Sequence, residues 1–208
     1  MSRLKPFAFS YLNDWCRYDS RFVDGLSPSK GQVDRLRCIS EAVIYYGVAR
    51  TLREIDEPNR LGTALTALDR VTGPIAVDAV DSIVCGLAEA FQSAYGRYAI
   101  SAASKLLWIR YRSPVVIYDS QAIACLNKTV SGNLREGEYK PYRQEWLRQF
   151  AEREESIRSA CAELCRVKDF SLAHAMSDAE LMELVSSRWF QERVFDKYLW
   201  SGGGIAAD

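Results

Sequence analysis

The sequence has few of the features that mark a metal site, a membrane protein or an exported protein. It contains one histidine, His174, and none of its six cysteines forms a CxxC pair, so zinc-ligand spacing is missing. We therefore expect free, buried or half-buried thiols and neither a metal nor an organic cofactor. No run approaches the roughly 20 apolar residues of a membrane span, and no signal peptide is visible. These absences predict a cytoplasmic protein with no membrane partner.

The sequence also has no excess of charge of either sign. Lysine and arginine total 27, aspartate and glutamate total 27, and the formal net charge is +0. This balance argues against a protein that simply coats nucleic acid, because such binding depends on neutralising phosphates. It leaves room for a local basic patch. The hydrophobic fraction of 48% is typical of a globular domain.

Apolar residues recur every three or four positions along most of the chain, which predicts amphipathic α-helices. The clearest of these helices are expected over residues 33–52, 80–94, 146–164 and 181–198. Residues 131–141, with two glycines and a proline, are expected to form a loop. The prediction is an all-α fold of about eight helices.

Local signals place several helix ends. Ser177 followed by Glu180 is typical of a capping box, and Gly96 can end the helix before it. We expect one domain over residues 1–200, in which the two chain ends could form a second small lobe beside a cleft. Residues 201–208 are expected to be a flexible tail.

The segment most suggestive of chemistry is residues 99–128. A helix predicted at 101–112 is apolar nearly all round and should be buried, yet it carries Lys105. Desolvation disfavours an ammonium group, and a neutral amine can attack carbon to form a Schiff base. The alternative is that Lys105 extends its methylene groups over the core and keeps its amine in water.

Asp119 is predicted to open the next helix, over residues 120–128. Its simplest role is the N-cap, in which its carboxylate accepts a backbone N–H. If the turn at 113–118 folds back, the same carboxylate would face the helix that carries Lys105. There it could stabilise positive charge that develops in a reaction.

A local basic segment accompanies these two residues. No acidic residue lies between Glu89 and Asp119, whereas the same interval contains four basic ones. Backbone phosphates could dock on this segment, although ordinary surface arginines would give the same pattern. The candidate nucleic-acid contacts are Arg97, Ser101, Ser104, Arg110 and Arg112.

Two short stretches, Ser104–Leu107 and Val116–Ser120, resemble a small bacterial group related to the 8-oxoguanine DNA glycosylase fold, within the helix-hairpin-helix glycosylase superfamily. Residues 188–200 also resemble the end of that group. The resemblance implies that Lys105 attacks the sugar C1′ of a flipped nucleotide and that Asp119 stabilises the transition state. The hairpin turn differs, because residues 99–103 contain no glycine.

The resemblance implies an N-glycosylase with lyase activity that excises an 8-oxoguanine-like base from DNA, in repair or in anti-phage defence. Trp108, Trp189 and Phe190 are candidates for stacking on the base, although large aromatic residues more often belong to the core.

Two other classes of function stay open. The first is a catalytically inactive module that binds nucleic acid or a protein partner, and the second is a helical scaffold with no nucleic-acid role.

Overall fold

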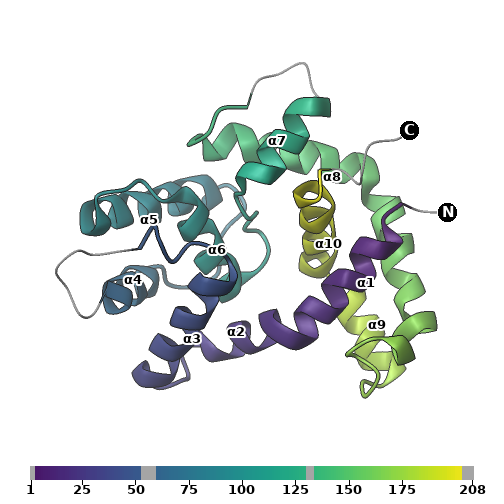
Figure 1. The fold of residues 1–208 in the computed structure, drawn as a ribbon. Helices are drawn as coiled ribbons and strands as arrows, with labels where there is room; N and C mark the ends of the chain where they lie inside the picture. The colour runs from purple at the N-terminus through teal and green to yellow at the C-terminus, as the bar shows by residue number, and fades with distance from the viewer. Residues whose placement is uncertain (1–2, 53–59, 130–133, 203–208) are drawn as a thin grey trace. The chain divides into compact units, whose positions relative to one another are not determined.

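The computed structural model describes residues 3–52, 60–129 and 134–202, and these residues form helices and turns without any β-strand (Figure 1). The all-α prediction is therefore confirmed. The α-helices are α1 (Lys5–Asp14), α2 (Ser20–Gly25), α3 (Gln32–Tyr45), α4 (Arg60–Asp69), α5 (Val80–Tyr95), α6 (Ile100–Tyr111), α7 (Ser120–Thr129), α8 (Tyr139–Ala162), α9 (Asp178–Ser186) and α10 (Arg188–Trp200). A π-helical turn, η1 (Trp15–Asp19), joins α1 to α2, and a 3₁₀-helix, η2 (Glu163–Phe170), follows α8.

The chain divides into two compact units. One consists of residues 1–20 and 119–208, and we call it the terminal unit because both chain ends contribute to it. The other consists of residues 21–118, and we call it the central unit. Lys105 belongs to the central unit, whereas Asp119 is the first residue of the second segment of the terminal unit.

In the central unit, α6 packs extensively along α5, and α4 packs against both α3 and α5 (Figure 1). Gly96 ends α5 in the left-handed conformation with φ 71°, as the sequence predicted. Only residues 96–99 connect the two helices, so α5 and α6 form a helical hairpin. Phe91 and Leu107 lie fully buried in the core.

In the terminal unit, α10 packs against α1, α7, α8 and α9. Three buried rings join α8 to α10: the ring centroids of Trp146 and Phe150 are 5.4 Å apart, and Phe195 lies 5.1 Å from Trp146. The predicted capping box is confirmed at the start of α9, where the hydroxyl of Ser177 and the carboxylate of Glu180 bond each other's backbone N–H.

Several element boundaries differ from the sequence prediction. The helix predicted over 33–52 ends at Tyr45, because Gly47 turns the chain with φ 70° and the backbone N–H groups of Val48 and Ala49 both bond the carbonyl of Val43. Val33 is 80% exposed, so the apolar face does not begin there.

The helix predicted over 181–198 is two helices. Ser187 has extended backbone angles, and the side-chain amide of Gln191 donates to the carbonyls of Val185 and Ser186. These bonds satisfy carbonyl groups that the end of α9 leaves without helical partners.

The loop predicted over 131–141 is shorter than expected at its far end. Helix α8 begins at Tyr139, and Pro141 fits in its first turn because a backbone N–H there has no helical acceptor. Residues 130–133 of that loop and 203–208 of the predicted tail lie outside the described residues.

Candidate functional site

Helix α6 provides the setting for the predicted nucleophile. An unbroken run of buried side chains extends from Ala102 to Ile109, so nearly the whole circumference of this helix is covered, as its apolar sequence predicted. Lys105 is inside this run and is only 7% exposed. Its side chain is therefore covered by protein along most of its length.

The Lys105 amine has a defined partner at the end of another helix. Its Nζ donates a hydrogen bond to the backbone carbonyl of Tyr46, with an Nζ–O distance of 3.3 Å. Tyr46 is the C-cap of α3, where carbonyl groups lack helical partners and a positive charge is favoured. Both the ammonium and the neutral amine can donate this bond. The bond therefore fixes the position of the nitrogen and is compatible with a nucleophilic role.

Asp119 is half-buried and caps α7, as the sequence predicted. Its Oδ1 accepts the backbone N–H of Gln121 at 2.9 Å, and its carbonyl accepts the N–H of Ile123 at 3.0 Å. These bonds hold the carboxylate at the start of the helix.

A buried hydrogen bond ties the segment before Asp119 to α6. The hydroxyl of Ser104 accepts the backbone N–H of Tyr118 at 2.9 Å and donates to the carbonyl of Ser101 at 3.2 Å. Ser104 precedes Lys105, and Tyr118 precedes Asp119. The residues adjacent to the two predicted catalytic side chains are thus bonded within the central unit.

Ser104 is fully buried, so it cannot touch a phosphate in this structure, and its predicted nucleic-acid contact is replaced by this internal one. Ser101, one turn earlier on α6, is half-buried.

The predicted phosphate-binding arginines differ in their surroundings. Arg97 is exposed in the turn between α5 and α6, and Arg112 is half-buried at the C-cap of α6. Arg110 points inward instead: its Nη1 donates to the carbonyl of Leu26 at 2.8 Å and lies 3.6 Å from Asp69 Oδ1. Because its guanidinium is already engaged and its side chain is only 11% exposed, Arg110 is better placed to support the fold than to bind phosphate.

Two of the three candidate stacking residues are core residues. Trp108 is 1% exposed and Phe190 is fully buried, so neither presents a ring face on which a base could stack. Trp189 is half-buried in the terminal unit, where its ring centroid lies 4.5 Å from that of Trp15. Packing explains these positions, since large apolar rings contribute most when fully buried.

An aromatic cluster that the sequence analysis missed lies at the end of α3. Tyr45 and Tyr46 have ring centroids 5.0 Å apart in an edge-to-face arrangement, and Phe22 lies 5.6 Å from Tyr45 and 6.4 Å from Tyr46. Tyr46 is also the residue whose carbonyl holds the Lys105 amine. The signal in the sequence was two consecutive tyrosines before Gly47, a helix-ending glycine.

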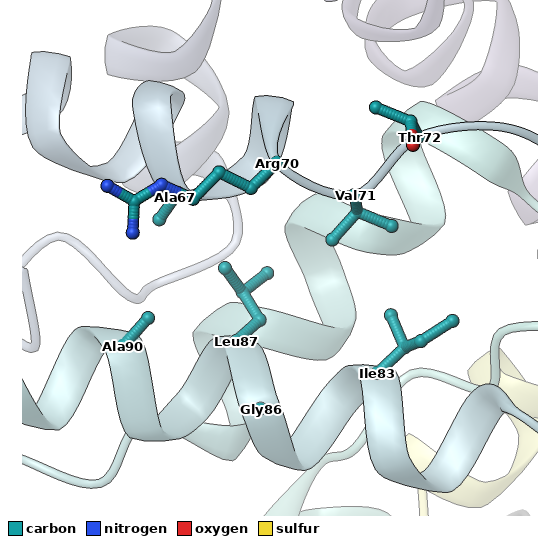
Figure 2. Close-up of a pocket in the computed structure, with 8 residues that line it drawn as sticks. All are labelled: Ala67, Arg70, Val71, Thr72, Ile83, Gly86, Leu87 and Ala90. Atoms are coloured by element: carbon teal, nitrogen blue, oxygen red, sulfur yellow. The ribbon is translucent and has the colours of Figure 1, made fainter.

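A separate hollow of about 490 Å³ lies between α4 and α5 in the central unit (Figure 2). It is mostly apolar, and Figure 2 shows Ile83 and Leu87 rising from α5 toward the end of α4. None of the predicted catalytic, nucleic-acid-binding or base-stacking residues is among its lining residues. These are Ala67, Arg70, Val71, Thr72, Ile83, Gly86, Leu87 and Ala90.

Metal-binding clusters and membrane-spanning helices are both absent from the part of the chain that the structure describes. No group of three or more histidine, cysteine, aspartate or glutamate side chains in it is placed to hold a metal ion. None of its helices combines the length and apolar character needed to cross a bilayer.

No protein-family model, curated protein or solved structure matches the chain. Function therefore has to be inferred from the chemistry of the described residues.

Proposed function

We propose that this protein is a nucleic-acid glycosylase with lyase activity, in which the Lys105 amine displaces a modified, 8-oxoguanine-like base from a deoxyribose. The observation that carries the proposal is the placement of Lys105. A lysine that is 7% exposed on an apolar helix, with its nitrogen bonded to the backbone carbonyl of Tyr46, presents an amine that is largely covered by protein. Attack on carbon requires the neutral form of this amine.

The proposed reaction begins when the target nucleotide leaves the base stack. The neutral Lys105 amine attacks the sugar C1′, and the bond between C1′ and the base nitrogen breaks with its electron pair going to the base. The base takes up a proton as it leaves, and the amine nitrogen gives up one. Opening of the sugar ring then produces a Schiff base, from which β-elimination can cleave the strand before water releases the lysine.

Asp119 is proposed to stabilise the positive charge that develops on the sugar. A carboxylate held rigidly at a helix start needs little reorganisation when that charge appears. Asp119 begins the second segment of the terminal unit, whereas Lys105 belongs to the central unit. Within the central unit, the Ser104–Tyr118 bond holds the residue before Asp119 next to the residue before Lys105.

The decisive experiment is covalent trapping with borohydride. The protein is incubated with single- or double-stranded oligonucleotides that carry an abasic site or 8-oxoguanine, and the Schiff base is reduced to a stable adduct. Wild-type protein is expected to form the adduct, and Lys105→Met, which keeps most of the apolar stem, should abolish it. Lys30→Met is the matched control, because Lys30 is a surface lysine of the central unit paired with Asp24. Absence of an adduct on every substrate would refute the proposal.

The Asp119→Asn variant distinguishes the proposed catalytic role of the carboxylate from its role as helix N-cap, because asparagine also caps helices well. We expect it to slow adduct formation on 8-oxoguanine DNA by about 100-fold or more, the scale seen when one stabilising group is removed from a reaction centre. Its melting temperature should stay close to that of the wild type. An unchanged rate would remove Asp119 from the mechanism.

Phosphate contacts are proposed for Arg97 and Arg112, which flank α6. Replacing either with alanine should weaken binding to all sequences. It should also reduce the steepness of the plot of log K, the logarithm of the binding constant, against the logarithm of the salt concentration by about 1 per contact. Arg70→Ala is the control, because Arg70 is an exposed arginine of the same unit that the proposal does not use.

One observation favours the second candidate, a nucleic-acid-binding module without catalysis. The bond from Lys105 to the end of α3 also gives the lysine a purely structural role at a helix C-terminus. This candidate predicts salt-dependent binding to nucleic acid that Lys105→Met leaves unchanged, together with no borohydride adduct.

A further inference from the structure

The tyrosine corner, defined here as Tyr45 and Tyr46 at the end of α3, is the aromatic surface of the central unit joined directly to the Lys105 amine. Tyr46 bonds the amine through its carbonyl, and its ring lies edge-to-face with that of Tyr45. Tyr45 is 36% exposed and Tyr46 is half-buried, so part of this aromatic surface faces solvent.

Phe22, which belongs to the same unit, packs against both rings of the tyrosine corner. The buried ring of Phe22, only 1% exposed, lies within 5.6 Å of one tyrosine ring and 6.4 Å of the other, measured between centroids. Gly47 follows at φ 70° and ends the helix, so the two rings stand at a turn. Rings packed against a rigid neighbour lose little freedom when a ligand stacks on them.

The chemistry proposed for Lys105 requires a base-binding surface close to its amine. The base to be removed is attached by one bond to the carbon that the amine attacks, so the base must lie beside the amine. Of the aromatic residues predicted for this purpose, Trp108 and Phe190 are buried, so neither offers a free ring face.

We propose that the tyrosine corner binds the nucleobase of the target nucleotide by stacking, with the sugar presented to Lys105. The inference rests on the proposed function for the reaction, and it adds the two side chains that hold the target base when that base is unpaired, in a single strand or flipped out of a duplex. A stacked, paired base presents no free ring face, whereas an unpaired base can stack on aromatic side chains.

The test compares binding to two single strands of the same sequence, one with 8-oxoguanine and one with a tetrahydrofuran abasic analogue at that position. All proteins carry Lys105→Met, so that the strands stay intact and binding is measured without chemistry. Tyr45→Ala and Tyr46→Ala should each reduce the preference for the base-containing strand by about 10-fold, within the range for loss of one stacking contact. Tyr45→Phe and Tyr46→Phe, which keep the ring, should preserve the preference.

Tyr98→Ala is the matched control, because Tyr98 is a tyrosine of the same unit with a similar exposure of 40%. Its preference should equal that of the parent protein. If the alanine variants at 45 and 46 also retain the full preference, while melting temperatures show that they are folded, the inference is wrong. The same holds if Tyr98→Ala lowers the preference equally.

The two proposals fail separately. If wild-type protein forms the adduct but the tyrosine variants keep an unchanged preference for the base-containing strand, the stacking inference is wrong. The proposed reaction is still supported in that case. A lost preference without any adduct supports the tyrosine corner as a base-binding site and removes the reaction.

Discussion

The hydroxyl of Ser104 accepts the backbone N–H of Tyr118 at a distance of 2.9 Å, in a place where both residues are buried. This bond joins the middle of α6 to the segment that leads to α7. It therefore links the residue that precedes Lys105 to the residue that precedes Asp119.

Ser104→Ala should destabilise the protein by about 1–3 kcal/mol, because it leaves the buried N–H of Tyr118 without this acceptor. The free energy of unfolding in urea measures the loss. Ser93→Ala is the control, since Ser93 is an exposed helical serine that bonds only the carbonyl of Glu89 in its own helix. We expect less than about 0.5 kcal/mol from that change. Equal losses from the two variants would show that the Ser104 bond contributes nothing specific.

Asp69→Ala should destabilise the central unit by about 1–3 kcal/mol, because two largely buried arginines lose a shared carboxylate. Arg35 binds both oxygens of Asp69, and Arg110 lies 3.6 Å from one of them. The expected loss is smaller than for a fully buried pair, because the Asp69 side chain is 38% exposed.

Asp24→Ala is the comparison for that prediction, because it breaks the exposed pair with Lys30 and should cost less than about 1 kcal/mol. Urea denaturation of the two variants under identical salt distinguishes them. A loss at Asp69 no greater than that at Asp24 would contradict the structural role given to the Arg35–Asp69–Arg110 group.

Asp196 should make the terminal unit more stable as the pH falls from neutral toward 4. Burial raises the pKa of its carboxyl to about 6, against 3.8 ordinarily, although Arg193 and Trp146 both donate hydrogen bonds to it. Between these two values the folded state binds the proton more tightly than the unfolded state. The contribution is therefore fully present below the unfolded pKa and is lost as the pH rises through about 6.

Asp196→Asn removes this titration. The stability difference between wild type and variant should favour the wild type more at about pH 4.5 than at about pH 7.5, by on the order of 2 kcal/mol. Taking the difference cancels other groups, including Glu145 and Glu180, whose lowered pKa values act in the opposite direction. A difference that does not change with pH would mean that the folded state does not raise the pKa of Asp196.

Arg112→Gly should be more stable than Arg112→Ala by about 1 kcal/mol. Arg112 has φ 58° at the end of α6, a conformation that costs a residue with a Cβ roughly that much and costs glycine almost nothing. Both variants lose the same side chain, so their difference isolates the backbone. Both should also bind oligonucleotides more weakly than wild type, because both lack the phosphate contact proposed for Arg112. Thermal unfolding and salt-dependent binding provide the two measurements.

Several features of the candidate site were predictable because they depend on a few neighbouring residues. The burial of α6 followed from its apolar circumference, the role of Asp119 as N-cap from its position before α7, and the end of α5 from Gly96. The break at Ser187 was missed, because the apolar period continues through it and the stabilising Gln191 bonds arise only after the chain bends.

Other features could not be predicted, because they depend on residues far apart in the chain. Nothing near Lys105 in the sequence indicates that its amine meets the carbonyl of Tyr46, 59 positions earlier. Trp108 and Tyr45 are both large aromatic residues on helices, yet one is 1% exposed and the other 36%. Only packing against the rest of the unit distinguishes a core ring from a surface ring.

The amino-acid sequence by itself determined the all-α class, the caps of α7 and α9 and the covered state of α6, since helix formation and capping join residues at most a few positions apart. The tertiary structure decided which carbonyl holds the Lys105 amine, which arginine points inward and which aromatic rings face solvent. These outcomes depend on how separate helices pack against one another, and the spacing of residues along a single helix does not specify that packing.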